Sequence, residues 1–529
     1  MPNLLSEVIE SSAKGGFFLV AGNVLANLIL ALGLFVIGRL LGPEQYGLYS
    51  LAFVLPTFLL LFVDLGINPA LIRYCASFCA KGQERRAAKF LKYGLLFEIA
   101  VALIVFTFSF TFSDYLATYL LNRPDAGFYI RMVSLTIPFQ VAFATLNASF
   151  VALSKMKSAA LTTTLQAATK VSVSIGLILL AFGVTGAIAG QVASYVVASI
   201  IGAVILFSVY YRKLNKNNHE TAKPGEIFRT LVTYGFPLYI AAILGGFVPQ
   251  YQGIVLAWFT SNTEIGNLKA TTNLLTIVGM ITGPIATTLF PAFSKLDPEG
   301  NDIKRFFQIS LKYTTLLIVP AAILLLLFSE EIVNIAYGTS YASAPFFLSV
   351  YSTSFLMVSL GSLVLSSFFN GTGNTKTTFK MLIVSLALIV PLTPILTYSY
   401  GVIGLIVAHL VSSLCANLYG LHVAKSRFKI RLFYKNLLRI YAVSAISAVP
   451  VIILLYISRL WWLWNVILGF VIYLSVWLTL IPAAGILQAA EIQKLEILLP
   501  KNRYLRRILI PIISYEKKLL NKTQNEHKT

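Results

Sequence analysis

The stretch FFLVAGNVLANLILALGLFVIG, residues 17–38, runs for 22 residues without a charged side chain. A helix needs about 20 apolar residues to cross the hydrocarbon core of a bilayer, so this segment is long enough to span a membrane. A cleavable signal peptide would have a shorter apolar core followed by a small-residue cleavage site, and no such site is visible here. We therefore expect 17–38 to be a retained transmembrane helix.

The composition of the whole chain agrees with this expectation. Of its 529 residues, 57% are apolar and only 12% are charged, and the mean hydropathy is +0.80. Soluble globular proteins are about 45–50% apolar and about 25% charged. So little polar surface cannot cover a water-soluble body, and the surplus apolar side chains must face lipid. The sequence predicts an all-α integral membrane protein.

Apolar segments of spanning length recur along the chain. After 17–38 we expect helices near 47–67, 93–112, 128–150, 158–181, 186–209, 231–257, 268–291, 309–328, 346–369, 379–398, 402–424, 437–458 and 461–483. This gives about fourteen transmembrane helices. The very short links 182–185 and 399–401 predict tight hairpins between neighbouring helices.

The distribution of basic residues tests this count. With the N-terminus placed in the cytoplasm, 35 of the 41 Lys and Arg residues fall on inner segments, five on outer segments, and Lys170 alone inside a span. Positive residues mark the cytoplasmic side of a membrane protein. Adding or removing one helix would scramble this alternation, so we expect both termini to be cytoplasmic. The net charge of +21 then reflects orientation and anionic lipid, and no nucleic-acid partner is expected.

The chain also contains an internal repeat. A shift of about 219 residues aligns the first twelve helices as two sets of six, and brings Glu44-Gln45-Tyr46-Gly47 onto Thr263-Glu264-Ile265-Gly266. Both halves begin on the same side, so the repeat is parallel, an arrangement typical of transporters. The predicted organisation is a cytoplasmic N-terminus (1–16), an N-lobe (17–209), a cytoplasmic linker (210–230), a C-lobe (231–424), a cytoplasmic loop (425–436), a helix pair (437–483) and a basic amphipathic tail (484–529).

Three cysteines, Cys75, Cys79 and Cys415, are too few for a disulfide framework or a zinc site. Cys75 and Cys79 would share one helix face, where they are more typical of small packed residues than of a metal pair. We expect no cofactor, no metal and no catalytic residues.

Short motifs resemble one known family. The run Arg39-Leu40-Leu41-Gly42-Pro43-Glu44-Gln45-Tyr46-Gly47 is similar to the R-x-L-G-P-x-x-Y-G signature of the polysaccharide transporter family, within the multidrug, oligosaccharidyl-lipid and polysaccharide exporter superfamily. Asp64-Leu65-Gly66-Ile67-Asn68 through Arg73-Tyr74, and Phe290-Pro291-Ala292-Phe293-Ser294, resemble two further family motifs.

The resemblance implies a function. Family members are flippases that move polyprenyl-diphosphate-linked oligosaccharides across the membrane for polysaccharide biosynthesis, by alternating access of two lobes around a cationic cavity. It further implies location in the plasma membrane, contact with membrane lipids, and a pathway shared with glycosyltransferases or a polymerase.

Cationic residues are the candidates for binding such a substrate. Lys170 lies about twelve residues into the span 158–181, and a mid-bilayer lysine must face a cavity or a partner. Its alternative role is a structural ion pair with Glu98 or with another acid in the interior of the lobe. The other cavity candidates, each of which also fits an interfacial anchor, are Arg39, Arg73, Arg131 and Lys269.

Three further residues are candidates for gating or ion coupling: Asp64, Glu98 and His409. Asp64 and Arg73 flank the inner end of the second helix, where either a salt bridge or substrate contact fits. Glu98 lies inside the third helix and fits a proton carrier or an ion pair. His409 could titrate near neutral pH, yet a lone helical histidine is more often a packed hydrogen-bonding residue.

Two other functions remain open. An ion-coupled drug exporter of the same superfamily would favour acids in its cavity, and such exporters often carry a coupling acid in their first helix, where this chain has Asn23 and Asn27. A multi-spanning glycosyltransferase would place an acidic metal-binding pair on an outer loop, but the D-x-E of this chain, Asp297-Pro298-Glu299, lies on a predicted inner loop.

Overall fold

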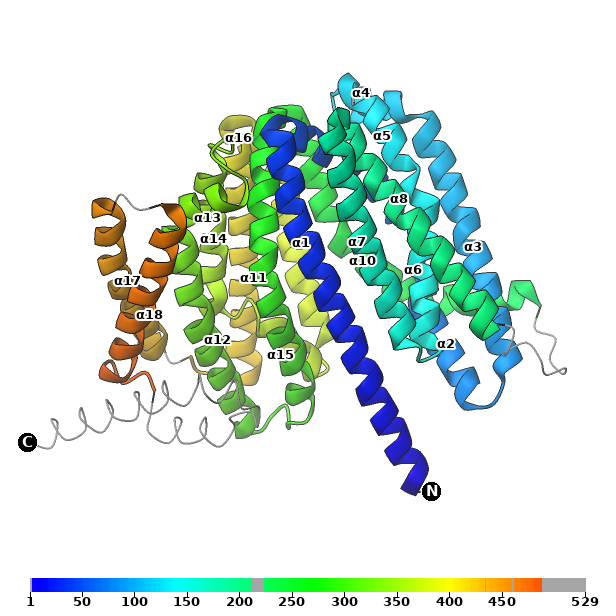
Figure 1. Cartoon of the computed structure of the whole chain (residues 1–529). Coiled ribbons are helices and arrows are strands. Elements are labelled where there is room, and N and C mark those ends of the chain that lie inside the picture. The colour runs from blue at the N-terminus through cyan, green and yellow to red at the C-terminus, as the bar shows by residue number, and fades with distance from the viewer. Residues whose placement is uncertain (1, 212–222, 433, 459–460, 488–529) are drawn as a thin grey trace, which may run out of the picture. The chain divides into compact units, whose positions relative to one another are not determined.

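The computed structural model describes residues 2–211, 223–432, 434–458 and 461–487, and the regular elements within these ranges are all helices (Figure 1). Ten of the described helices are long and apolar enough to cross a membrane, or eleven if one bent pair is a single span. The predicted all-α, multi-pass membrane protein is confirmed. The basic tail after residue 487 lies outside the described residues, as does most of the linker 210–230.

The described residues divide into two compact units, of which the first contains residues up to 273 together with 397–402. Its elements are α1 (Pro2–Leu60), α2 (Ile67–Ala80), α3 (Glu84–Thr111), α4 (Ser113–Leu120), η1 (Pro124–Ala126), α5 (Gly127–Ser134), α6 (Thr136–Ala152), α7 (Met156–Leu177), η2 (Ile178–Phe182), α8 (Gly183–Val204), η3 (Ile205–Tyr211), α10 (Pro224–Phe259) and the first third of α11 (Asn262–Ser294).

The second unit holds the rest of α11 and the later helices. These are α12 (Asn301–Leu327), α13 (Ser329–Ala336), α14 (Ala344–Leu356), η4 (Met357–Leu360), α15 (Leu365–Gly371), α16 (Thr375–Phe428), α17 (Tyr434–Ile457) and α18 (Trp462–Ala483). A cluster of phenylalanine rings from α11, α12, α15 and α16 forms part of its core.

Three long helical runs each contain two predicted spans and change direction at a residue with positive φ. The turning residues are Gly42 in α1 (φ 71°), Ala181 and Gly183 before α8 (φ 67° and 51°), and Gly401 in α16 (φ 56°). Only glycine adopts such a conformation without steric cost. All fourteen predicted spans map onto the described helices, while the number of membrane crossings and the side of each terminus stay predictions.

The internal repeat is visible in the backbone. Gly183 has φ 51° and ψ −131°, and Gly401, 218 positions later, has φ 56° and ψ −138°. Two hairpins at matching positions of the two sequence halves therefore share one unusual backbone conformation, which supports the alignment of the halves.

One predicted boundary is wrong. The helix expected at 47–67 ends at Leu60, and the chain turns before α2 begins. Leu65 and Gly66 have positive φ values of 39° and 77°. Gly66 lies directly against the backbone of Gly235 on α10, and neither glycine has room for a Cβ atom. Hydropathy does not reveal where two backbones meet, so the break was not apparent from the sequence.

The span predicted at 346–369 is also broken. After α14 and η4, Gly361 takes a left-handed conformation (φ 82°), and α15 continues after a bend of 40°. The hydroxyl of Tyr441, on α17, bonds to the Leu356 carbonyl oxygen and lies 2.9 Å from Ser359 Oγ. A carbonyl released by a helix break in a membrane needs a partner, and α17 supplies it.

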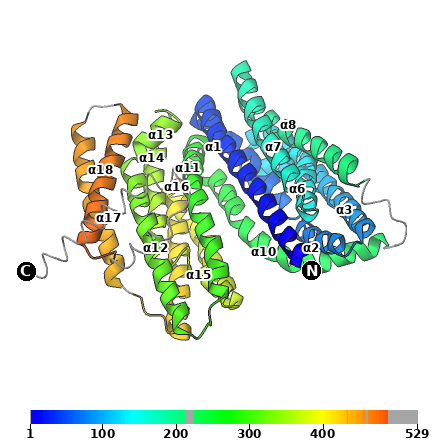
Figure 2. The ribbon, with the colours of Figure 1, turned by 60° about the horizontal axis from the view of Figure 1, so that its bottom comes forward.

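The last helix pair is packed onto the second unit. α17 and α18 lie side by side, and within this unit α17 contacts α12 and α18 contacts α13 (Figure 2). Tyr473 on α18 is fully buried and its hydroxyl donates to the Ser444 carbonyl oxygen at 3.2 Å. The pair is therefore an integral part of this unit's core.

Removal of the Tyr441 hydroxyl will destabilise this region. We expect Tyr441→Phe to lower the free energy of unfolding by about 1 kcal/mol, the scale of a hydrogen bond between transmembrane helices, because the Leu356 carbonyl at the helix break loses its partner. Thermal unfolding in detergent measures the effect. Tyr456→Phe is the matched control, since Tyr456 lies on the same helix and is 92% exposed. Equal melting temperatures for both variants would contradict the role of Tyr441.

Candidate functional site: a pair of unpaired lysines

Two lysines of the first unit lie within electrostatic range of each other. Lys170 comes from the middle of α7 and Lys269 from the first third of α11, and both side chains are partly buried. The charge of Lys269 acts on Lys170. Within the described ranges, neither ammonium group makes a hydrogen bond or an ion pair with a protein side chain. Two such cations repel each other, and an anion placed between them would relieve that repulsion.

The lysine pair lies close to a crossing of two backbones. Gly47 on α1 contacts the Asn262 carbonyl oxygen, and Gly266 on α11 contacts the Pro43 carbonyl oxygen. These four residues are related by the repeat, because 43 aligns with 262 and 47 with 266. We call this contact the glycine crossing. It depends on the absence of side chains, since a Cβ atom at either glycine would overlap the opposite backbone.

Lys269 lies on the face of α11 that makes this crossing. Gly266, Lys269 and Asn273 are spaced three and four residues apart, so they share one helix face. Asn273 Nδ2 donates to the hydroxyl of buried Tyr46 at 2.6 Å. Tyr46 in turn stacks on Tyr49. The amide and the phenol groups beside Lys269 are thus bonded or stacked with one another, and they hold this face of α11 against α1.

The polar residues around Lys170 have a different role from the lysine. Thr162 bonds to Asn147 Oδ1 at 3.1 Å, and Gln166 Nε2 donates to Ser194 Oγ at 3.0 Å. These bonds join α7 to α6 and α8. The polar run of α7 therefore serves helix packing in large part, and its charged member is the one left without a partner among the described residues.

The acidic candidates lie together, away from the lysines. Thr145 donates to Glu98 Oε2 at 3.0 Å, and the carboxylate of Asp64 is near enough to act on Glu98. The alternative of an ion pair between Glu98 and Lys170 is wrong, because Glu98 bonds to Thr145 and makes no ion pair within the described residues.

Arg73 has aromatic partners. Its guanidinium lies 4.3 Å from the ring centre of Tyr234 on α10 and 5.6 Å from that of Tyr74. Within the described chain it makes no ion pair with Asp64, so the salt bridge considered from the sequence is wrong. The contact with Tyr234 instead joins α2 to the beginning of α10.

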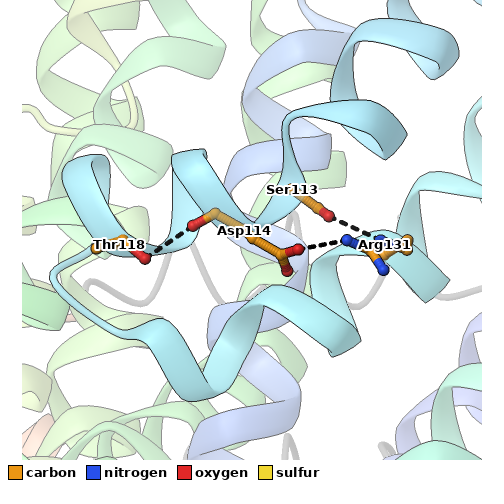
Figure 3. A network of polar contacts seen from close by, with 4 residues as sticks. All are labelled: Ser113, Asp114, Thr118 and Arg131. Atoms are coloured by element: carbon orange, nitrogen blue, oxygen red, sulfur yellow. Dashed lines mark hydrogen bonds and ion pairs between the residues drawn. The ribbon is translucent and has the colours of Figure 1, made fainter.

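Arg131 is held at a helix end. Figure 3 shows its guanidinium directed at Asp114, with which it forms an ion pair, and at Ser113 Oγ, 3.1 Å away. Asp114 belongs to α4, and its carbonyl oxygen also accepts a bond from Thr118. Both charged side chains are substantially exposed, as expected of an anchor.

The remaining two candidates have distinct surroundings. Arg39 is exposed on α1, three residues before the turn at Gly42, and takes part in contacts there. His409 on α16 packs its ring 5.3 Å from Tyr351, at an interplanar angle of 33°. His409 is therefore packed as one alternative expected, but its buried Nδ1 makes no hydrogen bond among the described residues.

Arg123 was predicted only to be one of the five outer basic residues, and its structural role was not predicted. Arg123 Nε donates to the Ala257 carbonyl oxygen at 2.9 Å, and its Nη2 donates to that of Thr260. In the opposite direction, Trp258 Nε1 donates a hydrogen bond to the Leu120 carbonyl oxygen at 2.7 Å. The guanidinium caps the C-terminus of α10, where the helix dipole favours a cation.

Loss of this cap will weaken the first unit. We expect Arg123→Gln to lower the free energy of unfolding by about 1–3 kcal/mol, because two carbonyl groups at the end of α10 lose a charged donor. Arg123→Lys keeps the charge but loses the planar two-point contact. Its free energy of unfolding will therefore lie between those of the wild type and of Arg123→Gln. Thermal unfolding in detergent gives the order. An Arg123→Gln protein as stable as the wild type would exclude the capping role.

The cysteines do not form a metal centre in the described residues, where no group of three or more His, Cys, Asp or Glu side chains is suited to a metal ion. Burial raises the pKa of the Cys75 and Cys79 thiols. Both therefore stay protonated near neutral pH, which makes them weak metal ligands.

The chain is a multi-pass helical membrane protein with a partly buried cation pair. Residues 12–297, more than half of the chain, match the family described as polysaccharide biosynthesis protein. The chain belongs to this family, as its motifs predicted.

Individual proteins match at low identity. The putative O-antigen transporter of Shigella flexneri is 22% identical over 397 residues, which cover 74% of this chain and 93% of the relative. The solved structure of the lipid II flippase MurJ in an inward closed conformation has a TM-score of 0.68 at 16% identity, covering 87% of this chain and 98% of MurJ. An inward-facing multidrug transporter of the MATE family matches with a TM-score of 0.60 at 15% identity, over 77% and 94% of the two chains. The two structural matches show that this chain has the same fold.

Proposed function

We propose that this protein is a flippase of the plasma membrane that translocates a polyprenyl-diphosphate-linked oligosaccharide for polysaccharide biosynthesis. The observation that carries the proposal is the pair Lys170 and Lys269, two partly buried cations without a protein partner among the described residues. A diphosphate carries two or more negative charges and is the complement of such a pair. Family membership and the similarity to an O-antigen transporter and to a lipid II flippase support the same substrate class.

The proposed mechanism is alternating access of an N-lobe (17–209) and a C-lobe (231–424). The lysines bind the diphosphate, and the polyprenyl chain stays in lipid. Transport then requires backbone contacts that can separate and form again. The glycine crossing and the contact between Gly66 and Gly235 are suited to this, because neither depends on interlocked side chains. Glycosyltransferases or a polymerase of the same pathway would make and use the substrate.

The charge of the site argues against a drug exporter. The fold is shared with a multidrug transporter and does not separate the two functions. A carrier of cationic drugs would need acids where this chain places Lys170 and Lys269. The carboxyl groups of Asp64 and Glu98 lie elsewhere, beside Thr145.

Reconstitution tests the proposal. The purified protein is placed in proteoliposomes with a fluorescent polyprenyl-diphosphate sugar, and an impermeant quencher measures how much probe crosses the bilayer. We expect crossing to depend on the protein and to be inhibited by an unlabelled polyprenyl diphosphate. A probe that carries a cationic drug head group is the control. Movement of the cationic probe alone would overturn the flippase assignment in favour of an exporter.

A further inference from the structure

A buried acidic pair lies at the break between α1 and α2. Val63, before the break, packs against Ala102 of α3, and Ile67, after the break, belongs to a cluster with Leu91 of the same helix. Glu98 lies between Leu91 and Ala102 on one face of α3. The break therefore holds Asp64 next to Glu98, close enough for the carboxyl group of Asp64 to act on that of Glu98.

The surroundings of the pair leave polar atoms without partners. Glu98 is 1% exposed, its Oε2 accepts from Thr145, and its buried Oε1 has no hydrogen-bond partner among the described residues. Asp64 Oδ1 accepts the Asn68 backbone N–H at 3.1 Å, which caps the start of α2. The buried Asn68 Oδ1 is likewise without a partner in the described chain. An orphaned carboxylate oxygen in such a place is costly unless a positive charge reaches it.

The described parts of the neighbouring helices form no ion pair with the two acids. The titratable groups that face the pair are the two acids themselves and Tyr239 of α10, which Asp64 influences. From α2 and α6 come the neutral side chains of Asn68 and Thr145. No lysine or arginine of the described residues forms an ion pair with either acid. Two adjacent carboxyl groups without a cation do not both ionise readily, because the two negative charges repel each other. Sharing one proton removes that repulsion.

We propose that Asp64 and Glu98 form a proton-binding site that couples flipping to the proton gradient. The pair holds one shared proton in one state, and releases it to leave two carboxylates in the other. One oxygen of each carboxylate is already bonded, to Thr145 and to the start of α2. A shared proton needs only the two oxygens that remain. The coupling role rests on the proposed flippase function, whereas proton binding itself does not.

The position of the pair gives the proton a mechanical effect. Asp64 is two residues from Gly66, whose backbone lies against that of Gly235 on α10. When the proton leaves, repulsion between the carboxylates acts on the break that carries Gly66. Proton occupancy thereby sets whether α10 is held against this end of the first lobe.

Labelling with dicyclohexylcarbodiimide tests the site directly, because this reagent modifies buried protonated carboxyl groups. We expect mass spectrometry of the full-length protein in detergent to find Glu98 labelled, with labelling falling by about tenfold for each pH unit above its midpoint. Asp64→Asn keeps the cap of α2 and will lower that midpoint, since the neighbouring negative charge is gone. Exposed Asp114, paired with Arg131, is the internal control and stays unlabelled.

Three results would overturn the proposal. Glu98 could fail to be labelled at any pH, or its labelling could stay the same at every pH. The third result is that sodium, but not choline, protects Glu98 from labelling, which would identify the site as a sodium site.

In proteoliposomes, Glu98→Gln will flip the fluorescent probe at a rate that no longer responds to a pH gradient. Unchanged gradient dependence in this variant would contradict coupling. Lys170→Gln separates the two proposals, because it will strongly reduce flipping and leave the labelling of Glu98 as in the wild type.

Discussion

Replacing Lys170 by Gln will reduce flipping of the fluorescent polyprenyl-diphosphate sugar by about 10- to 100-fold. A charge-assisted bond to a phosphate oxygen is worth about 1.5–3 kcal/mol, and Gln supplies a donor without the charge. Lys170→Arg will retain part of the activity, because the positive charge remains while the geometry of the donors changes. For both variants, the measurement is the rate at which the fluorescent probe crosses the proteoliposome membrane and becomes protected from the impermeant quencher.

Two further variants define the site. Lys269→Gln will have an effect of similar size, and the double variant will lose less than the two single losses combined, because both side chains bind one diphosphate. Lys295→Gln is the matched control, since Lys295 is an exposed lysine at a predicted inner loop. Variant abundance in the membrane is measured in parallel. Wild-type flipping by Lys170→Gln protein would remove this lysine from the mechanism.

Substitution of Gly47 or Gly266 by Val will abolish transport. A side chain at either position meets the backbone of the opposite helix, so the glycine crossing cannot form. We expect the loss to be at least about 100-fold, because a carrier that cannot close one end cannot complete a cycle. Flipping in proteoliposomes is again the measurement, with melting temperature in detergent as the check on folding.

The control for the crossing is Gly176→Ala on α7. A Cβ atom added at Gly176 meets no other atom within 4 Å, so this variant should flip at the wild-type rate. If Gly47→Val and Gly266→Val protein also retained transport, the crossing would be an incidental contact. If they failed to fold, Gly47→Ala and Gly266→Ala would serve as milder versions of the same test.

The positions of the spans were predictable, and two interruptions within them were not. Apolar length placed the long helices but not short ones such as α2, α4 and α13, and glycines in the short links marked the hairpins at Gly183 and Gly401. At each break the chain contacts another helix. After Leu60 it meets α10 through Gly66 and Gly235, and before Gly361 it meets α17 through Tyr441. Such breaks depend on partners far away in the sequence, so a sliding measure of hydropathy passes over them.

The site was predicted in part. The depth of Lys170 along its helix follows from counting residues, and its lack of an acidic partner among the described residues agrees with a role in substrate binding. Depth does not determine the direction in which a side chain leaves the helix, and for this reason Glu98 was assigned the wrong alternative partner. Arg123 was missed because capping the end of α10 requires knowledge of which loop lies beside that end.

The hydrogen bond from Tyr441 has a consequence for how this chain could be shortened. The repeat accounts for only twelve helices, so the final pair lies outside it. Yet the carbonyl that Tyr441 contacts belongs to the tenth span, inside the duplicated portion. A version trimmed after residue 432 would remove this donor from the broken span. The tenth span and the final pair therefore depend on each other for stability.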